Sequence, residues 1–271
     1  MRRPSPIFWG LLLTIAAAAL FPYLWIVLTS FKARTDILTT PPVWIHAPNL
    51  VNYQSMLFAR HFDRYLLNSI EIGVSSTLLA LGVGTLAAYA FSRYRVPAGN
   101  HLFFYILATR LGPPIAYALP LYFLFSSLGL LKTHIGVIMA HATFNLVLVV
   151  WMMKTFFDEI PAEIEEAATL DGCSEWQLLS RVSVPMALPG LVTAAIFVFI
   201  FSWNELLYSM ILSAGKANTL PAMIPSLVMN TGTLWGEVAA AAVVQTIPVI
   251  AFTFIAQRHL VRGLTFGAVK G

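Results

Sequence analysis

Charged residues are scarce in this chain: Asp, Glu, Lys and Arg make up 10% of its 271 residues. Soluble domains carry about a quarter, so the shortage excludes a soluble globular protein. The chain also lacks paired cysteines, because Cys173 is the single one, and this excludes a disulfide scaffold. We expect Cys173 to be an inert thiol, buried or half-buried. With 58% hydrophobic residues, the composition predicts a protein that spans the membrane several times.

Basic residues do not gather into a patch. The net charge is +4, but the 16 Lys and Arg residues are scattered between apolar runs, which is unlike a nucleic-acid-binding surface. Loops between membrane spans explain them better, because cytoplasmic loops are enriched in Lys and Arg. Nucleic acid is therefore not an expected partner.

The sequence signatures of common enzymes are missing. No G-x-x-x-x-G-K-[ST] phosphate loop is present, since Gly82-Val83-Gly84 lies in an apolar run and lacks the lysine. The six histidines are dispersed and show no metal-ligand spacing. No serine lies in a G-x-S-x-G setting. We therefore expect no catalytic residues, no metal site and no cofactor in this chain.

Six apolar runs are long enough to cross a membrane, because a spanning helix needs about 20 mostly apolar residues. The runs cover 8–31, 70–92, 102–128, 135–153, 186–212 and 238–257. They predict an all-α, polytopic membrane protein with a single domain over 1–271 and both termini on one side. The first run is too long for the core of a cleaved signal peptide, so we interpret it as a retained helix.

The distribution of Lys and Arg indicates which side is cytoplasmic. With the N-terminus inside, nine basic residues lie in inner segments and six in outer ones, which follows the positive-inside tendency. Both termini and the 154–185 loop are then cytoplasmic, and 32–66 is an outer loop near the membrane face. In the second run, Ala80, Gly84 and Ala88 are four apart, a spacing that favours close helix packing in membranes.

The 154–185 loop holds seven of the twelve carboxylates. Pro161 suits the first turn of a helix over 162–170, and Gly172 is a typical end for it. Ser174 with Gln177 three residues later indicates a capping box for a second short helix through about Val182. The loop is either a solvated connection with ordinary surface acids or a compact two-helix unit.

The residues of this loop favour the second alternative. Glu166-Ala167-Ala168, three residues, Gly172, nine residues and Val182-Ser183-Val184-Pro185 resemble the EAA motif of ABC importer permeases. Nearly the whole chain resembles the carbohydrate branch of this family, the MalG-like permeases. The segments that carry the wider resemblance are Pro48–Tyr53, Leu67–Ser69, Ser202–Glu205 and Val261–Gly271. Arg110–Pro114 with Pro120–Tyr122 resembles members that serve polyols or modified sugars.

The resemblance implies a type I ABC importer permease fold in the bacterial inner membrane. It implies a transporter for a sugar, polyol or sugar derivative, in which this chain pairs with a second, non-identical permease. The other implied partners are a cytoplasmic ATPase dimer, which binds ATP and Mg, and an extracytoplasmic solute-binding protein. Implied ATPase-coupling residues are Glu166, Ala167, Ala168, Asp171, Gly172 and Pro185. Gly267, Lys270 and Gly271 would contact the ATPase from the C-terminal tail.

Other function classes remain open from the sequence. The solute is either a carbohydrate or another small molecule, and a membrane-embedded enzyme or a structural bundle is the remaining alternative. An enzyme would need a catalytic constellation near one interface, and a structural bundle would not explain the acidic two-helix loop. Both alternatives are therefore weaker than the permease interpretation.

Polar residues inside the apolar runs are costly and usually face a cavity or a partner. Arg110 pairs with Glu205 or another subunit, extends to the interface, or contacts the solute. Asn145 lies four residues from His141, so both share one helix face, where they bond between helices or line a passage. The candidates for lining a translocation path or stabilising the bundle are Arg110, Tyr122, Asn145, Trp203, Asn204 and Glu205.

Overall fold

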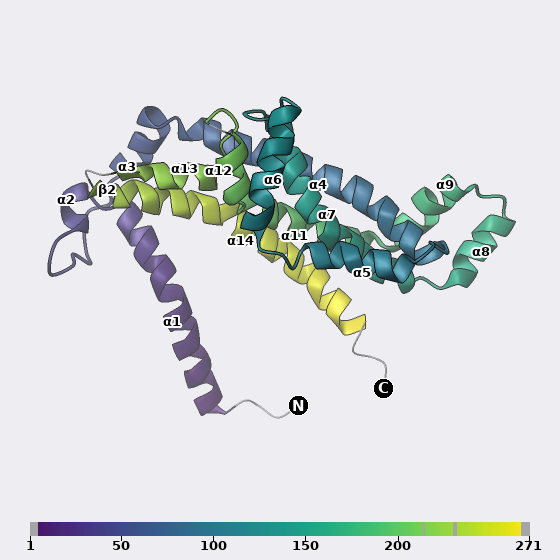
Figure 1. Cartoon of the computed structure of the whole chain (residues 1–271). Helices are drawn as coiled ribbons and strands as arrows, with labels where there is room; N and C mark the ends of the chain where they lie inside the picture. Colours follow the sequence, from purple (N-terminus) through teal and green to yellow (C-terminus); the bar gives the residue numbers. More distant parts are fainter. Residues whose placement is uncertain (1–4, 214, 230–231, 267–271) are drawn as a thin grey trace. The chain divides into compact units, whose positions relative to one another are not determined.

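The computed structural model describes residues 5–213, 215–229 and 232–266. The chain forms two compact units, one of residues 1–64 with 223–248 and the other of residues 65–222 with 249–271. The described elements are almost all helices (Figure 1). These units are groups of residues in mutual contact, and they do not test the prediction of a single permease domain over 1–271.

Four described helices are long and apolar enough to cross a membrane, namely α1 (Pro6–Ser30), α4 (Phe62–Arg93), α7 (His134–Asp158) and α14 (Trp235–Phe266). Two bent helix pairs raise the number to six if each pair is one span. The first pair joins α5 (Gly99–Thr109) to α6 (Pro114–Ser127) at an angle of 95°, and the second joins 175–186 to α11 (Leu188–Trp203) at 76°. The all-α, polytopic fold class is thus confirmed.

Two of the six predicted spans correspond to bent helix pairs rather than to single continuous helices. The predicted span 102–128 breaks between Thr109 and Pro114, because Pro113 and Pro114 have no backbone N–H to continue the helical hydrogen bonds. The predicted span 186–212 breaks after Trp203, and a new helix, α12 (Leu207–Ser213), begins after three intervening residues.

In the first unit, the loop over 32–66, which the sequence predicts to be external, is tied to the end of α1. The buried Asn52 amide donates to the carbonyls of Ser30 and Lys32, at 2.9 and 2.8 Å. Trp44 packs against Trp25, with ring centroids 4.8 Å apart. The sequence therefore predicts the position of this loop in the chain but not its contacts. Its short elements are α2 (Arg34–Ile37), α3 (Val51–Gln54) and the π-helical turn η1 (Ser55–Ala59).

A short hairpin that the sequence did not predict also belongs to this unit. It follows the helical turn η3 (Ile224–Leu227), and its strands are β1 (Val228–Met229) and β2 (Gly232–Thr233). The strands are antiparallel, with Val228 opposite Thr233. Two-residue strands are too short for the alternating apolar pattern by which strands are recognised.

In the second unit, α7 packs against α11, α12 and, through small residues, α4. Gly84 of α4 is buried, and a Cβ at this position would lie 2.7 Å from Cβ of Val149 on α7. Ala80 and Ala88 on the same face are 1% and 0% exposed. The predicted small-residue packing is therefore present, and α7 is its partner.

This contact yields a paired test. Gly84→Val is expected to destabilise the protein by about 1–3 kcal/mol, because a branched side chain overpacks the helix contact. Gly82→Val is the matched control: Gly82 lies in the same helix, and a Cβ there would meet nothing within 4 Å. Thermal unfolding of both purified variants measures the difference. Equal midpoints for the two would contradict the close α4–α7 contact.

Candidate functional site

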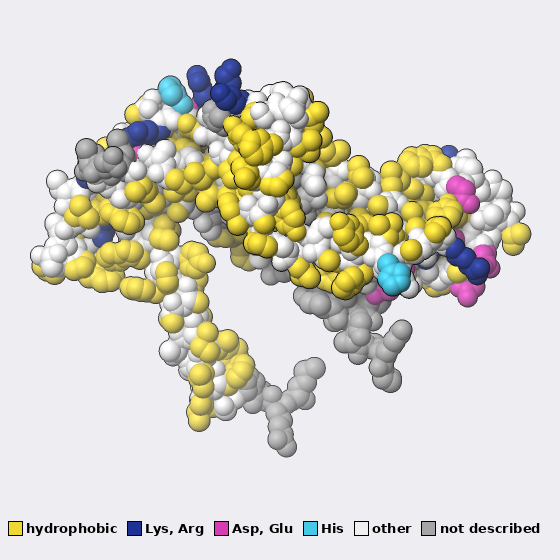
Figure 2. Space-filling view, in the orientation of Figure 1, with side chains coloured by type: hydrophobic (Ala, Val, Ile, Leu, Met, Phe, Trp, Pro, Cys, Tyr) yellow, Lys and Arg dark blue, Asp and Glu magenta, His cyan; other side chains and the backbone are white. Residues whose placement is uncertain are grey.

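The acidic loop folds as the sequence predicts in its main features. Helix α8 (Ala162–Leu170) ends two residues before Gly172, whose φ of +89° favours glycine. Ser174 and Gln177 form a capping box at the start of α9 (Glu175–Leu178). The chain then continues through the π-helical turn η2 (Leu179–Ser183) into α10 (Val184–Met186). Figure 2 shows that Asp and Glu side chains gather over α8 and α9 on an otherwise mostly apolar face.

The inner side of α8 is fixed by a buried carboxylate. Glu165 is 6% exposed and forms an ion pair with Nε of Arg93, the last residue of α4. Ser183 donates its hydroxyl to the other carboxylate oxygen at 2.7 Å. Arg93 also donates to the carbonyls of Phe157 and Ile160, at 2.8 and 3.1 Å. The end of α4, the end of α7, α8 and η2 therefore meet at one charged group.

The residues that the resemblance assigns to ATPase coupling lie on α8, in the turn after it and, for Pro185, in α10. Ala168 is half-buried, and the others are exposed: Glu166, Ala167, Asp171, Gly172 and Pro185. Two large apolar side chains beside them are also exposed, Leu170 by 89% and Trp176 by 66%. The loop thus presents a mixed acidic and apolar surface while its inner side is held in place.

A hydrogen bond connects α9 to the segment after α4. Tyr94 donates its hydroxyl to Glu175 at 2.6 Å, and this bond to a carboxylate raises the pKa of Tyr94 to about 12. The hydroxyl therefore keeps its proton at neutral pH and stays a donor. Cys173 between the two short helices is a free, half-buried thiol, as expected.

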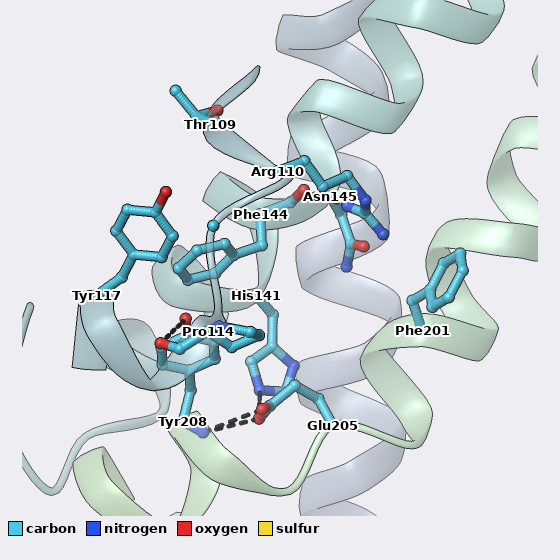
Figure 3. A pocket seen from close by; sticks show the side chains of 11 residues that line it. Thr109, Arg110, Pro114, Tyr117, His141, Phe144, Asn145, Phe201, Glu205 and Tyr208 are labelled. Carbon is cyan, nitrogen blue, oxygen red and sulfur yellow. Dashed lines mark hydrogen bonds and ion pairs between the residues drawn. The ribbon is translucent and has the colours of Figure 1, made fainter. Parts of the chain in front are cut away.

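The second candidate site is a pocket of the second unit that is lined by aromatic side chains and by a few charged and polar ones (Figure 3). Its volume is about 270 Å³, close to the lower end of small-molecule pockets, roughly 300–1,000 Å³. It lies where the break between α5 and α6 approaches the break between α11 and α12. Of the predicted path residues, the lining includes Arg110, Asn145 and Glu205, together with His141, Tyr117, Phe144, Phe201 and Tyr208.

Glu205 is held by backbone and histidine donors. Its carboxylate accepts the backbone N–H groups of Tyr208 and Ser209 at 3.0–3.1 Å, so it caps the start of α12. Nε2 of His141 lies 3.1 Å from one carboxylate oxygen. Nδ1 of His141 is 2.7 Å from the Ser202 hydroxyl, which bonds in turn to Ser76 of α4 at 2.9 Å. This chain of bonds joins α4, α7, α11 and α12.

Arg110 lines the same pocket but makes its contacts with a backbone carbonyl and an aromatic ring instead of with Glu205. It donates to the carbonyl of Phe144 at 2.6 Å, and its guanidinium lies 5.1 Å from the ring centre of Phe201. Within the part of the chain that the structure describes, Arg110 has no carboxylate within ion-pair distance. The alternative in which Arg110 pairs with Glu205 is therefore wrong for this structure, because His141 occupies that place.

The other predicted path residues lie outside this pocket. Trp203 is 1% exposed and stacks on Phe199, with ring centroids 5.6 Å apart. Asn204 donates to the carbonyl of Ile200 and thus finishes α11. Tyr122 is exposed on α6 beside Phe123. Gly267, Lys270 and Gly271 of the tail lie outside the described residues.

Sequence reasoning missed Arg93, Glu165 and the pocket tyrosines. Glu165 is adjacent to Glu166, and a helix turns about 100° per residue, so the two carboxylates point to different sides. The helical period marks Glu165 with Ala168 and Thr169 as one face. A signal for Glu165 was therefore present, although it could not name Arg93, which is 72 positions away.

Comparisons with known proteins agree with these features. Residues 80–266 match the family described as binding-protein-dependent transport system inner membrane component. The trehalose transport system permease protein SugB of Mycobacterium tuberculosis is 39% identical, over 97% of both chains. A probable ABC transporter permease protein, y4oR of Sinorhizobium fredii, is 38% identical over 97% of this chain and 94% of its own. A chain in the crystal structure of a bacterial ABC transporter involved in the import of the acidic polysaccharide alginate matches with a TM-score of 0.77 and 26% identity. That match covers 95% of this chain and 99% of the other.

Proposed function

The chain belongs to the family of binding-protein-dependent transport system inner membrane components, and from this premise we propose that it imports a sugar, polyol or sugar derivative. It is an ABC importer permease, and many of its relatives carry sugar names. We propose that it pairs with a second, non-identical permease in the bacterial inner membrane. A solute-binding protein delivers the solute, and a cytoplasmic ATPase dimer, which binds ATP and Mg, supplies the energy.

One observation carries the coupling part of this proposal: the outer side of α8 is exposed while its inner side is anchored. Leu170 and Trp176 are apolar side chains in water, which a partner surface would cover favourably. Glu166 offers an exposed carboxylate to a basic group of that partner. Because Glu165 is ion-paired with Arg93, a push on α8 would be transmitted to the cytoplasmic ends of α4 and α7. The loop can thus act as a rigid lever.

The orientation follows from this role. An ATPase in the cytoplasm requires the 154–185 loop to be cytoplasmic, and six spans then place both termini on that side. The outer loop tied to α1 faces the binding protein. Labelling single cysteines on 165–175 in intact cells, in a Cys173→Ser chain, tests this orientation: reaction with a membrane-impermeant reagent from outside would contradict it.

The direct test of the function is reconstitution. The chain, its partner permease and the ATPase are assembled in proteoliposomes, and a sugar-loaded binding protein is added outside. We expect stimulated ATP hydrolysis and uptake of radiolabelled sugar, and neither when this chain is omitted. The solute is first found by thermal shift of the binding protein, since a bound ligand raises the stability of the native state. Thermal stabilisation by amino acids or metal ions and by no sugar or polyol would contradict the carbohydrate class.

The turn after α8 is a sharp test of coupling. Gly172→Leu is expected to reduce uptake strongly, because a Cβ at φ of +89° is strained by about 1–2 kcal/mol and tilts the outer side of α8. Glu166→Lys is expected to reduce uptake too, since it opposes the basic partner group. Cys173→Ser, at the neighbouring position, is the control. Normal uptake and normal ATPase binding by both variants would contradict the coupling role of the loop.

The C-terminal tail gives a second test of coupling. Gly263, Gly267 and Gly271 are four apart in the sequence, and a segment with so little side-chain volume suits a narrow groove between ATPase subunits. Removing 266–271 is expected to lower stimulated ATP hydrolysis and uptake without preventing membrane insertion. A replacement tail of equal charge should not restore activity. Full activity of the truncated complex would show that the tail has no coupling role.

A further inference from the structure

The pocket beside Arg110 lies where two interrupted helices meet. The chain is non-helical between α5 and α6 and again between α11 and α12, and both breaks contribute to the lining. Backbone without helical hydrogen bonds is tolerated at membrane depth only inside protein or beside a water-filled cavity. In secondary transporters, interrupted helices typically form the solute site, and the same physical argument applies to the two breaks here. The two breaks therefore indicate a site rather than a packing defect.

One side chain in the pocket is buried and has no partner. Asn145 is 5% exposed and lines the pocket from the middle of α7. Its amide makes no hydrogen bond to any residue that the structure describes. The small exposed part of this side chain faces the pocket, so the hydrogen-bonding groups of its amide are available to a bound solute. Figure 3 shows Asn145 and Arg110 among the side chains that line the pocket.

The hydrogen-bonding groups of the pocket that are still free to bind a solute are mainly donors. Arg110 uses one nitrogen for the carbonyl of Phe144, which leaves further N–H groups of its five. Glu205 contributes little acceptor capacity, because His141 and two backbone N–H groups already bond to it. The pocket is therefore suited to a solute that presents oxygen acceptors to Arg110 and Asn145.

The walls of the pocket are aromatic. Phe144 and Tyr208 stack with centroids 4.3 Å apart, and Tyr117 lies 6.1 Å from Phe144. Tyr208 is fixed by its hydroxyl bond to the carbonyl of Pro114 at 2.9 Å. Gly112 lies close to the end of the Tyr117 ring, so a Cβ at this position would displace the tyrosine hydroxyl. The aromatic rings form a suitable surface for the C–H face of a sugar ring. Arg110 and Asn145 could then donate to the oxygen atoms at its edge.

We propose that this pocket is a solute subsite within this permease chain, which binds one sugar unit through its hydroxyl or carboxylate oxygens at Arg110 and Asn145. This inference rests on the proposed function, and it adds that this chain contacts the solute itself. Neutral sugars and sugar acids share the oxygen acceptors that the donors recognise.

The test uses cysteine chemistry in the assembled transporter. Asn145→Cys is made in a Cys173→Ser chain and treated with two methanethiosulfonate reagents of similar size and opposite charge. We expect modification, with the anionic reagent about tenfold faster than the cationic one because of the nearby guanidinium. Arg110→Gln should abolish this preference. Tyr117→Cys reports on the same pocket if Asn145→Cys does not assemble. Thr155→Cys, exposed on α7 outside the pocket, is the control whose preference should not depend on Arg110.

D-glucose and D-glucuronate serve as the competing probes. Slower modification of Asn145→Cys with both sugars supports recognition of hydroxyl groups, and slower modification with glucuronate alone supports recognition of a carboxylate. Unreactive cysteines at 145 and 117 in both nucleotide states, or no effect of either sugar, would overturn the subsite. This result is separate from the uptake experiment, because modification requires no transport. A complex that is protected by sugar but imports none contradicts the proposed function alone.

Discussion

Arg93→Gln is expected to reduce sugar uptake by the reconstituted transporter by about tenfold or more, since every ~1.4 kcal/mol is a factor of ten in population. The side chains of Arg93 and Glu165 are 18% and 8% exposed. Removal of one partner from such a buried pair costs about 3–5 kcal/mol, because the other charge stays buried without compensation. The inner side of α8 would then detach from the ends of α4 and α7, and the lever would lose its anchor.

The matched control is Arg95→Gln, two residues further along. Arg95 is exposed, so its loss changes the local charge equally but leaves the anchor intact. Uptake, stimulated ATP hydrolysis and protease sensitivity of 154–185 are measured for both variants. We expect Arg93→Gln to keep membrane insertion, to expose the loop to protease and to lose uptake. Equal behaviour of the two variants would show that the ion pair has no part in coupling.

Glu165→Gln completes this experiment as a double-mutant cycle. If Arg93 and Glu165 act through each other, the double variant should lose no more uptake than the single variant with the larger loss. Ser183 still needs an acceptor in each case, so Glu165→Gln retains one of the bonds to the site. Independent, additive losses would place the two residues in different roles.

The spans were predictable from the sequence because length and hydropathy determine them, and the helix ends follow from local residues. Predicted runs 8–31 and 135–153 agree closely with α1 and α7. The breaks were harder, because an apolar composition is compatible with both a straight and a bent helix. Pro113 and Pro114 were a visible signal for the first break. The second break has no proline or glycine between 203 and 207.

The 154–185 loop was predictable to the level of single turns, since Gly172 and the Ser174 capping box act within a few residues. The pocket beside Arg110 was predictable only in part. The four-residue spacing places His141 and Asn145 on one face of α7, but Tyr117 and Tyr208 reach the pocket from segments 91 positions apart, as the numbering shows. Partners far apart in sequence leave no local pattern. The ion pair of Glu165 with Arg93 was unpredictable for the same reason, because its two residues are 72 positions apart.

Glu205→Leu is expected to have the largest effect on the stability of the second unit. Glu205 accepts two backbone N–H groups at the start of α12 and lies 3.1 Å from His141. Leucine leaves these donors without an acceptor, and each buried unsatisfied group costs about 1–3 kcal/mol. His141 would also lose the partner that holds it toward Ser202 and α4. We therefore expect a strongly lowered unfolding midpoint and no uptake.

Glu205→Gln separates the two roles of this carboxylate. The amide of glutamine keeps one oxygen acceptor for the backbone of α12, so most of the cap remains, while the negative charge beside His141 is lost. We expect a midpoint between those of the wild type and Glu205→Leu. Leu206→Ala, at the adjacent and 40% exposed position, is the control and should unfold close to the wild type. Intrinsic fluorescence during heating measures all three. If Glu205→Leu had the same unfolding midpoint as Leu206→Ala, the carboxylate would not stabilise the start of α12. The break after Trp203 would then need another cause.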